Sequence, residues 1–173
     1  MSVTKNNSEK PKFYNSHRSR QLSKKSNEPI KTQKNYIKNT TNSEKNILEI
    51  GFGTGSSVID LQKNFKGNYY CIESYTLGIK NINKYIEENG IENIHVYQGD
   101  AIEIIEEYFA DKSLDEILIF FPDPWPKYKH RKRRILNNFS IRLFFEKLKL
   151  GGLIHFATDH INYAYSAKEI ISS

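Results

Sequence analysis

An alternation of short apolar segments with amphipathic ones, from Lys45 onward, is the feature that most constrains the fold. Five segments have the apolar, β-branched and aromatic composition of strands, at 46–50, 68–73, 93–98, 114–121 and 153–158. The stretches between them place apolar residues every three or four positions, as in helices that cover a core. Nearly continuous apolar strands joined by helices predict a parallel sheet covered on both faces. We therefore expect a doubly wound, mostly parallel, Rossmann-like α/β domain.

Composition divides the 173 residues into two regions. Residues 1–44 are rich in Lys, Asn, Ser and Thr, which predicts a basic, flexible arm, with a transit peptide as a second interpretation. Residues 45–173 carry the alternating pattern and are numerous enough for one domain with its own core. A single cysteine, Cys71, excludes an intramolecular disulfide framework and a CxxC-type zinc site, and we expect no metal site.

The net charge of +6 is distributed unevenly along the chain. Residues 1–46 have a balance of +8 and residues 127–134 one of +6, whereas the remainder has one of −8. Such asymmetry favours a nucleic acid as the partner, although a solvated tail and a solvated loop would give the same balance. No apolar run is long enough to span a bilayer, and the start has no signal-peptide h-region. We therefore expect no membrane partner and a cytoplasmic location.

Ligands of a doubly wound sheet bind at the carboxyl ends of its strands. The first strand leads into Glu49-x-Gly51-x-Gly53-x-Gly55, whose glycines allow a tight turn and close approach to a ligand. A dinucleotide fingerprint has its third glycine one residue later, where Ser56 stands. An acid two residues before GxGxG is instead the pattern of S-adenosylmethionine-dependent methyltransferases, in which Glu49 would meet the cofactor's ammonium group. A Rossmann oxidoreductase and a plain strand-to-helix turn are the alternatives.

Two further acids follow the next two strands. Glu73 ends the second strand, where a carboxylate accepts hydrogen bonds from both ribose hydroxyls of an adenosine, or stabilises the start of the following helix. Asp100 follows the third strand and either accepts from an adenine amino group or caps the next helix. Each alternative is reasonable singly, but three acids at three successive strand ends favour a nucleoside site.

The fourth strand leads into FPDPWPKYKHRKRR, in which the prolines exclude a helix. The block PDPWPK with its basic continuation (His130, Lys132, Arg133 and Arg134), together with the glycine loop, Glu73, Asp100 and Thr158-Asp159, resembles the bacterial-type tRNA (guanine-N7-)-methyltransferases. The similarity runs from about residue 46 to the end. The resemblance implies transfer of a methyl group from S-adenosylmethionine to N7 of the variable-loop guanine (position 46) of tRNA.

The resemblance also implies roles for individual residues. Asp123 matches the active-site residue and one of the cofactor-contacting positions, which also include Glu49, Gly51, Gly53, Glu73 and Asp100. Lys127 and Asp159 match substrate-binding positions. We expect Lys129, Arg131, Arg133 and Arg134 to contact RNA phosphates, and Trp125 either to stack on the base or to pack beneath the loop.

The chain departs from the family near its C-terminus. A class I methyltransferase sheet has seven strands, whereas five are predicted here, and the family's Thr-x-x-Glu substrate motif has no counterpart. We therefore expect a C-terminally shortened sheet with an exposed apolar edge. The alternative function is a truncated relative that binds tRNA with weak or no catalysis. No obligatory protein partner is inferred, and the chain is expected to be a monomer or a homodimer.

Overall fold

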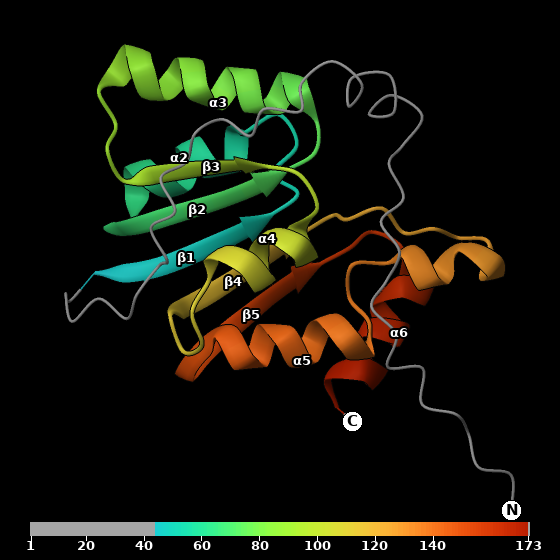
Figure 1. The fold of residues 1–173 in the computed structure, drawn as a ribbon. Helices are drawn as coiled ribbons and strands as arrows, with labels where there is room; N and C mark the ends of the chain where they lie inside the picture. Colours follow the sequence, from blue (N-terminus) through green and yellow to red (C-terminus); the bar gives the residue numbers. More distant parts are fainter. Residues whose placement is uncertain (1–43, 173) are drawn as a thin grey trace, which may run out of the picture.

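The computed structural model describes residues 44–172, so the predicted arm at 1–44 lies almost entirely outside the described residues. The described part contains one five-stranded sheet of order β3-β2-β1-β4-β5 (Figure 1). Its strands are β1 (Lys45–Ile50), β2 (Gly67–Glu73), β3 (Ile94–Gln98), β4 (Leu114–Phe120) and β5 (Leu148–Ala157). All four neighbouring pairs are parallel, which confirms the predicted doubly wound sheet.

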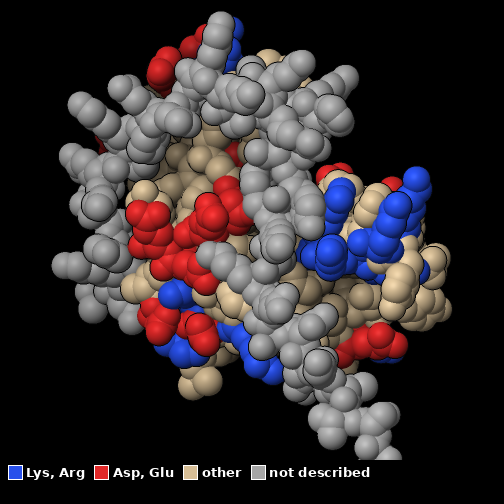
Figure 2. Space-filling view, turned by 45° about the vertical axis from the view of Figure 1, so that its right-hand side comes forward, with Lys and Arg blue, Asp and Glu red and all other residues tan. Residues whose placement is uncertain are grey.

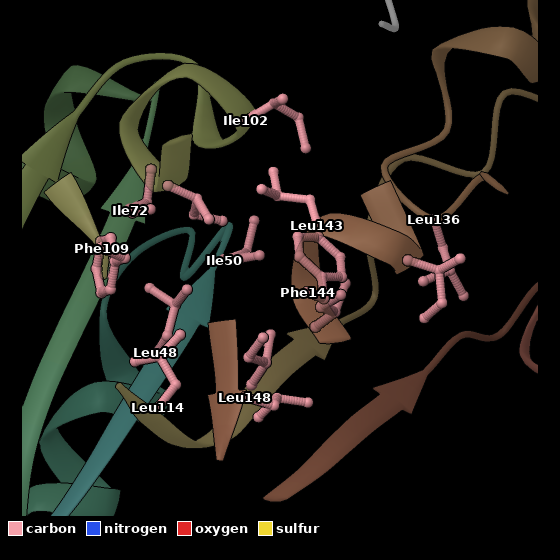
Figure 3. Packing of buried hydrophobic residues seen from close by; sticks show 14 of the residues in the cluster. Leu48, Ile50, Ile72, Ile102, Phe109, Leu114, Leu136, Leu143, Phe144 and Leu148 are labelled. Carbon is pink, nitrogen blue, oxygen red and sulfur yellow. The ribbon is translucent and has the colours of Figure 1, made fainter. Parts of the chain in front are cut away.

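Helices cover both faces of this sheet and enclose two separate cores. One face carries α2 (Ser56–Asn64) and α3 (Thr76–Asn89), and the other carries α4 (Ala101–Tyr108), α5 (Asn138–Lys147) and α6 (Ile161–Ile171) (Figure 1). Strand residues alternate between the cores, so that Ile47 packs with α2 and α3, whereas Leu48 packs with α4 and α5. Figure 3 shows the larger core, in which Phe144 of α5 and Leu114 of β4 are fully buried.

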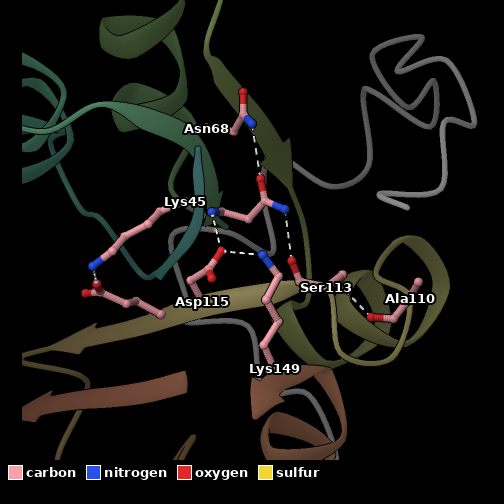
Figure 4. A network of polar contacts seen from close by, with 8 residues as sticks. Lys45, Asn68, Ala110, Ser113, Asp115 and Lys149 are labelled. Carbon is pink, nitrogen blue, oxygen red and sulfur yellow. Dashed lines mark hydrogen bonds and ion pairs between the residues drawn. The ribbon is translucent and has the colours of Figure 1, made fainter. Parts of the chain in front are cut away.

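Polar contacts join the amino-terminal ends of the strands, opposite the predicted site (Figure 4). Asn46 has no exposed surface, and its Nδ2 donates to the Ser113 carbonyl at 2.9 Å while its Oδ1 accepts from Asn68 at 3.1 Å. Asp115 Oδ2 accepts from the Asn46 backbone N–H and from Lys149 Nζ, both at 2.8 Å. Because this network links β1, β2, β4 and β5, it fixes the strand positions from which the site residues project.

The start of the fifth strand differs from the prediction. The fifth strand was expected at 153–158, directly after Gly151-Gly152, but α5 ends at Lys147 and β5 begins at once with Leu148. Leu148 pairs with Leu114, and the next pairing joins Leu153 to Glu116, so the two glycines lie in an irregularity within the strand. The prediction was wrong because a pairing with β4, remote in sequence, sets the strand's start.

β5 forms one edge of the described sheet, as the prediction of a shortened sheet requires. Leu153 on this strand is 55 % exposed, and Phe145 on the neighbouring helix α5 is 51 % exposed. Exposed apolar side chains therefore occur on this edge strand and on the helix beside it, and the exposure of an edge by missing strands stays a prediction. In the same range, no helix combines the length and the apolar character that crossing a membrane requires.

Candidate active site

The predicted site residues converge because the sheet is parallel. Glu73 is the last residue of β2, and Glu49 lies one residue before the end of β1. Asp100, Asp123 and Asp159 follow the carboxyl ends of β3, β4 and β5. The chain runs outward from β1 to β3 and then returns to place β4 on the other side of β1. This reversal between β1 and β4 opens the crevice in which doubly wound sheets bind ligands. Among residues 44–172, no three His, Cys, Asp or Glu side chains are grouped as a metal site would require.

The loop between β1 and α2 has a backbone that suits glycine. Gly51, Gly53 and Gly55 all have positive φ, at 76°, 60° and 94°. A Cβ on Gly51 or Gly53 would meet no atom within 4 Å, so both backbones border open space. The same loop is approached closely from behind, because a Cβ on Gly78 of α3 would lie only 1.8 Å from the Gly53 carbonyl oxygen. Gly78 is thus a site residue that the sequence pattern missed.

Glu49 is buried but only half satisfied. Its side chain is 4 % exposed, and its Oε1 accepts a hydrogen bond of 2.6 Å from Ser57 Oγ. The other oxygen, Oε2, is buried without a partner among the described residues. Burial raises the pKa of Glu49, with the charge of Glu73 adding to the rise and the Ser57 hydrogen bond opposing it. A buried carboxylate with a free acceptor oxygen suits a cationic ligand group, as predicted for an ammonium.

Glu73 connects the glycine loop to the start of α3. Its Oε2 accepts from the Gly53 N–H at 2.8 Å, and its Oε1 accepts from the N–H groups of Ser74 at 2.6 Å and Tyr75 at 2.9 Å. Glu73 therefore has the structural role given as its alternative, because it satisfies backbone N–H donors at the start of α3. It does so while remaining partly exposed beside the loop, where a ribose contact stays a prediction.

Asp100 is the N-cap of α4. Its Oδ1 accepts from the N–H groups of Ile102 at 2.8 Å and Glu103 at 3.2 Å, so the capping alternative is confirmed. The cap uses one oxygen and fixes the direction of the second. An adenine contact therefore remains compatible with the cap and stays a prediction.

The predicted catalytic residue lies on a constrained loop after β4. Asp123 is exposed, between two residues whose φ is positive, Phe121 at 48° and Trp125 at 42°. Phe121 N–H donates to the Ala157 carbonyl at 2.8 Å, which extends the β4–β5 pairing into the loop. Asp159, predicted to bind substrate, is likewise exposed between β5 and α6.

Trp125 packs against residues of the basic run. The Arg133 guanidinium lies 4.8 Å from its ring centroid, and the His130 ring meets it edge-on at 5.9 Å. These contacts support the packing alternative for Trp125. Desolvation lowers the pKa of His130, and the nearby cations Arg133, Lys129 and Lys127 add to this effect.

The basic run forms a short 3-10 helix, η1 (Tyr128–Arg133), beside this loop. The side chains of Lys127, Lys129, Arg131 and Lys132 are exposed. Figure 2 shows Lys and Arg side chains gathered on the side of the molecule where η1 lies. This arrangement is suited to an anionic polymer.

Arg134 does not belong to this exposed group, which corrects the prediction that it contacts RNA. Its side chain is 2 % exposed, its Nε donates to the Pro124 carbonyl at 2.8 Å, and its guanidinium lies 4.4 Å from the Tyr163 ring centroid. The sequence places Arg134 in a run of cations, but the chain leaves η1 at this residue and turns the side chain inward. The sequence could not predict this burial, because it depends on packing against Tyr163, which is remote in sequence.

The parallel sheet, the glycine loop behind β1 and the acids at the strand ends define a class I methyltransferase fold. Solved structures agree on the fold: precorrin-6y C5,15-methyltransferase from Geobacter metallireducens is 17 % identical, with a TM-score of 0.59 over 75 % of this chain and 61 % of its own. A phosphoethanolamine N-methyltransferase of Haemonchus contortus, in complex with S-adenosyl-L-methionine, has a TM-score of 0.51 at 17 % identity, over 77 % of this chain and 29 % of its own.

The chain belongs to the family described as "Putative methyltransferase", whose model matches residues 43–173. Among its relatives, the tRNA (guanine-N(7)-)-methyltransferase of Francisella tularensis subsp. novicida is 44 % identical over 128 residues, which are 73 % of this chain and 56 % of that protein. The enzyme of the same name from Neisseria meningitidis serogroup A is 44 % identical over 73 % of this chain and 54 % of its own length. The chain thus spans about half the length of the curated relatives it matches.

Proposed function

We propose that this protein transfers a methyl group from S-adenosylmethionine to N7 of the variable-loop guanine of tRNA. The observation that carries the proposal is the arrangement after β4, the strand that pairs with β1 ahead of the glycine loop: exposed Asp123 follows β4 and directly precedes the cations of η1 in the chain. The names of the relatives at 44 % identity support the choice of guanine N7 and of tRNA.

The cofactor site is assigned to the β1–β3 half of the sheet. The unpartnered Oε2 of Glu49 fits the ammonium group of S-adenosylmethionine, and the open space beside Gly51 and Gly53 accommodates a ligand against the backbone. Glu73 is assigned to the ribose hydroxyls and Asp100 to the adenine amino group. When bound, the cofactor supplies an electrophilic methyl group on a sulfonium.

The chemistry of guanine N7 defines what the chain must do. N7 carries an in-plane lone pair, so no proton has to be removed before the methyl group is accepted, and the product ring is cationic. A general base is therefore not obligatory, and positioning and charge matter more. Asp123 is assigned to accept hydrogen bonds from the N–H groups of the guanine, which orients the base, and to stabilise the positive charge that develops on the guanine ring. Lys127 and Asp159 are assigned to the substrate.

RNA binding is assigned to the exposed cations. A guanine in folded tRNA must leave its stack to reach Asp123. Lys127, Lys129, Arg131 and partly exposed Arg133 lie where they could hold the flanking phosphates meanwhile. The cytoplasmic location and the monomeric or homodimeric state stay predictions.

The test is transfer of labelled methyl from S-adenosylmethionine to an unmodified tRNA transcript, followed by digestion and identification of the labelled base. We expect label on guanine N7 with the wild-type chain and with Asp60→Ala, an exposed acid on α2 that serves as control. Asp123→Ala is expected to abolish labelling while tRNA affinity is largely kept. Bound tRNA without label from the wild-type chain would instead favour the tRNA-binding alternative.

A further inference from the structure

The loop that carries Asp123 is held in an unfavourable conformation. Phe121 and Trp125 have φ values of 48° and 42°, in the left-handed region that side chains with a Cβ rarely adopt. For bulky aromatic residues this backbone costs free energy, so it persists only where surrounding contacts determine it. The loop therefore needs fixed attachments at both ends.

Its two ends are attached in different ways. At the sheet end, the Phe121 N–H continues the ladder by donating to the Ala157 carbonyl at 2.8 Å. At the far end, the Pro124 carbonyl, directly after Asp123, accepts from Arg134 Nε at 2.8 Å. A hydrogen bond with a charged donor is stronger than one between neutral groups, so Arg134 is the stronger attachment.

Arg134 is in turn fixed by the core. Its guanidinium lies 4.4 Å from the ring centroid of Tyr163, which has no exposed surface, and the Tyr163 hydroxyl accepts from the Leu136 N–H at 3.1 Å. This sequence of contacts runs from α6 through Tyr163 and Arg134 to Pro124.

The guanidinium is placed at a cost to stability. Arg134 Nη1 and Nη2 are buried without a hydrogen-bond partner among the described residues. Burial also lowers the pKa of Arg134. A cation whose task was to meet phosphate would remain at the surface, as Lys129 and Arg131 do. Burial of an incompletely satisfied cation instead indicates that it specifies one local conformation.

We propose that Arg134 is a positioning residue for methyl transfer, which holds the Pro124 carbonyl and thereby sets the place of Asp123. The expected effect on the rate of methyl transfer rests on the proposed function, but the attachment of the loop by Arg134 can be tested without measuring activity.

Trp125 is the only tryptophan of the chain, so its fluorescence reports on this loop alone. The experiment compares the wild-type chain of 173 residues with Arg134→Met, Arg134→Lys and the control Arg142→Met, which changes an exposed arginine on α5. Emission maxima and acrylamide quenching are measured, with urea-unfolded protein as the fully exposed reference. The kcat and the KM for tRNA are measured on the same samples.

We expect Arg134→Met to keep its circular dichroism and to expose Trp125 to quencher. We also expect kcat to fall by about 10- to 100-fold while KM for tRNA changes less than about twofold, because misplacement of a reacting group lowers the rate at unchanged binding. Arg134→Lys should recover part of both signals, and Arg142→Met should match wild type.

Unchanged Trp125 quenching in Arg134→Met would overturn the proposal, and so would a raised KM for tRNA at unchanged kcat. If Arg134→Met fails to fold, Arg134→Lys is judged by the same two criteria. A third outcome separates the two proposals. If Arg134→Met exposes Trp125 to quencher but the wild-type chain transfers no methyl group, the attachment of the loop by Arg134 is supported and only the proposed function is refuted.

Discussion

Replacing Glu49 with glutamine tests the assignment of the cofactor site most directly, because the side chain keeps its shape and loses its charge. In the folded chain one carboxylate oxygen accepts from Ser57 and the other is buried without a partner. Glutamine has only one acceptor oxygen, so Ser57 and a ligand ammonium would compete for it. A hydrogen bond to a charged group contributes about 1.5–3 kcal/mol, which corresponds to about 10- to 150-fold in Kd.

The assay is calorimetric titration with two ligands that share the adenosine thioether. S-adenosylhomocysteine carries an amino-acid chain with the ammonium group that Glu49 should contact, and 5′-methylthioadenosine has a methyl group in place of that whole chain. Glu49→Gln should raise the Kd of S-adenosylhomocysteine by about 10- to 150-fold and change the Kd of 5′-methylthioadenosine by less than about twofold. Glu87→Gln, an exposed acid on α3, serves as the matched control and should change neither affinity.

The same substitution should act in the opposite direction on the ligand-free fold. Since burial raises the pKa of Glu49 above 4.5, the folded state keeps this proton at pH values where the unfolded chain has released it. The contribution of Glu49 to stability therefore falls as pH rises through the raised pKa. At pH 7 we expect Glu49→Gln to have an equal or higher Tm than wild type. A lower Tm, or equal weakening of both ligands, would refute the assignment of Glu49 as an acceptor for the ammonium.

Three further predictions concern other parts of the chain. Binding of S-adenosylhomocysteine to wild type should strengthen as pH rises through the raised pKa of Glu49, and titrations of Glu49→Gln should lack this dependence. Gly78→Ala should weaken cofactor binding and lower stability by about 1–3 kcal/mol, because its Cβ would collide with the Gly53 carbonyl, whereas Asn81→Ala on the exposed side of α3 should do neither. Asn46→Ala should lower the urea unfolding free energy by about 1–3 kcal/mol by leaving the Ser113 carbonyl unsatisfied, with the cofactor Kd unchanged.

The sequence predicts the first four strands to within one residue at each end because their boundaries are local. Each of these runs of apolar residues is bounded by Gly, Asn, Ser or Pro, residues that favour turns. The start of β5 is not local, since Leu148 joins the sheet by pairing with Leu114 before Gly151 and Gly152 interrupt the strand. A pattern read along the chain treats those glycines as a boundary.

The candidate site shows the same division. Sequence position alone predicts that Glu49, Glu73 and Asp123 lie at the same end of the sheet, because the carboxyl ends of parallel strands meet there. It does not reveal which carboxylate oxygens are already used: Glu73 accepts from the Gly53 N–H and Asp100 caps α4, whereas Glu49 keeps a free oxygen. These differences depend on the directions of nearby backbone N–H groups, which cannot be predicted from the residue types.

Arg134 gives the clearest case, and it changes how the charge of the chain is understood. In the sequence it is one of six cations at residues 127–134, which suggests a uniform contact surface. In the fold its side chain is buried behind the Asp123 loop, whereas Lys127, Lys129, Arg131 and Lys132 stay exposed. The run therefore serves two purposes, since its exposed members attract phosphate and its last member fixes the loop that meets the base. Because the rest of the domain is acidic and screening limits such attraction to about 10 Å, the described residues would hold a polyanion on the η1 side, where Asp123 is exposed.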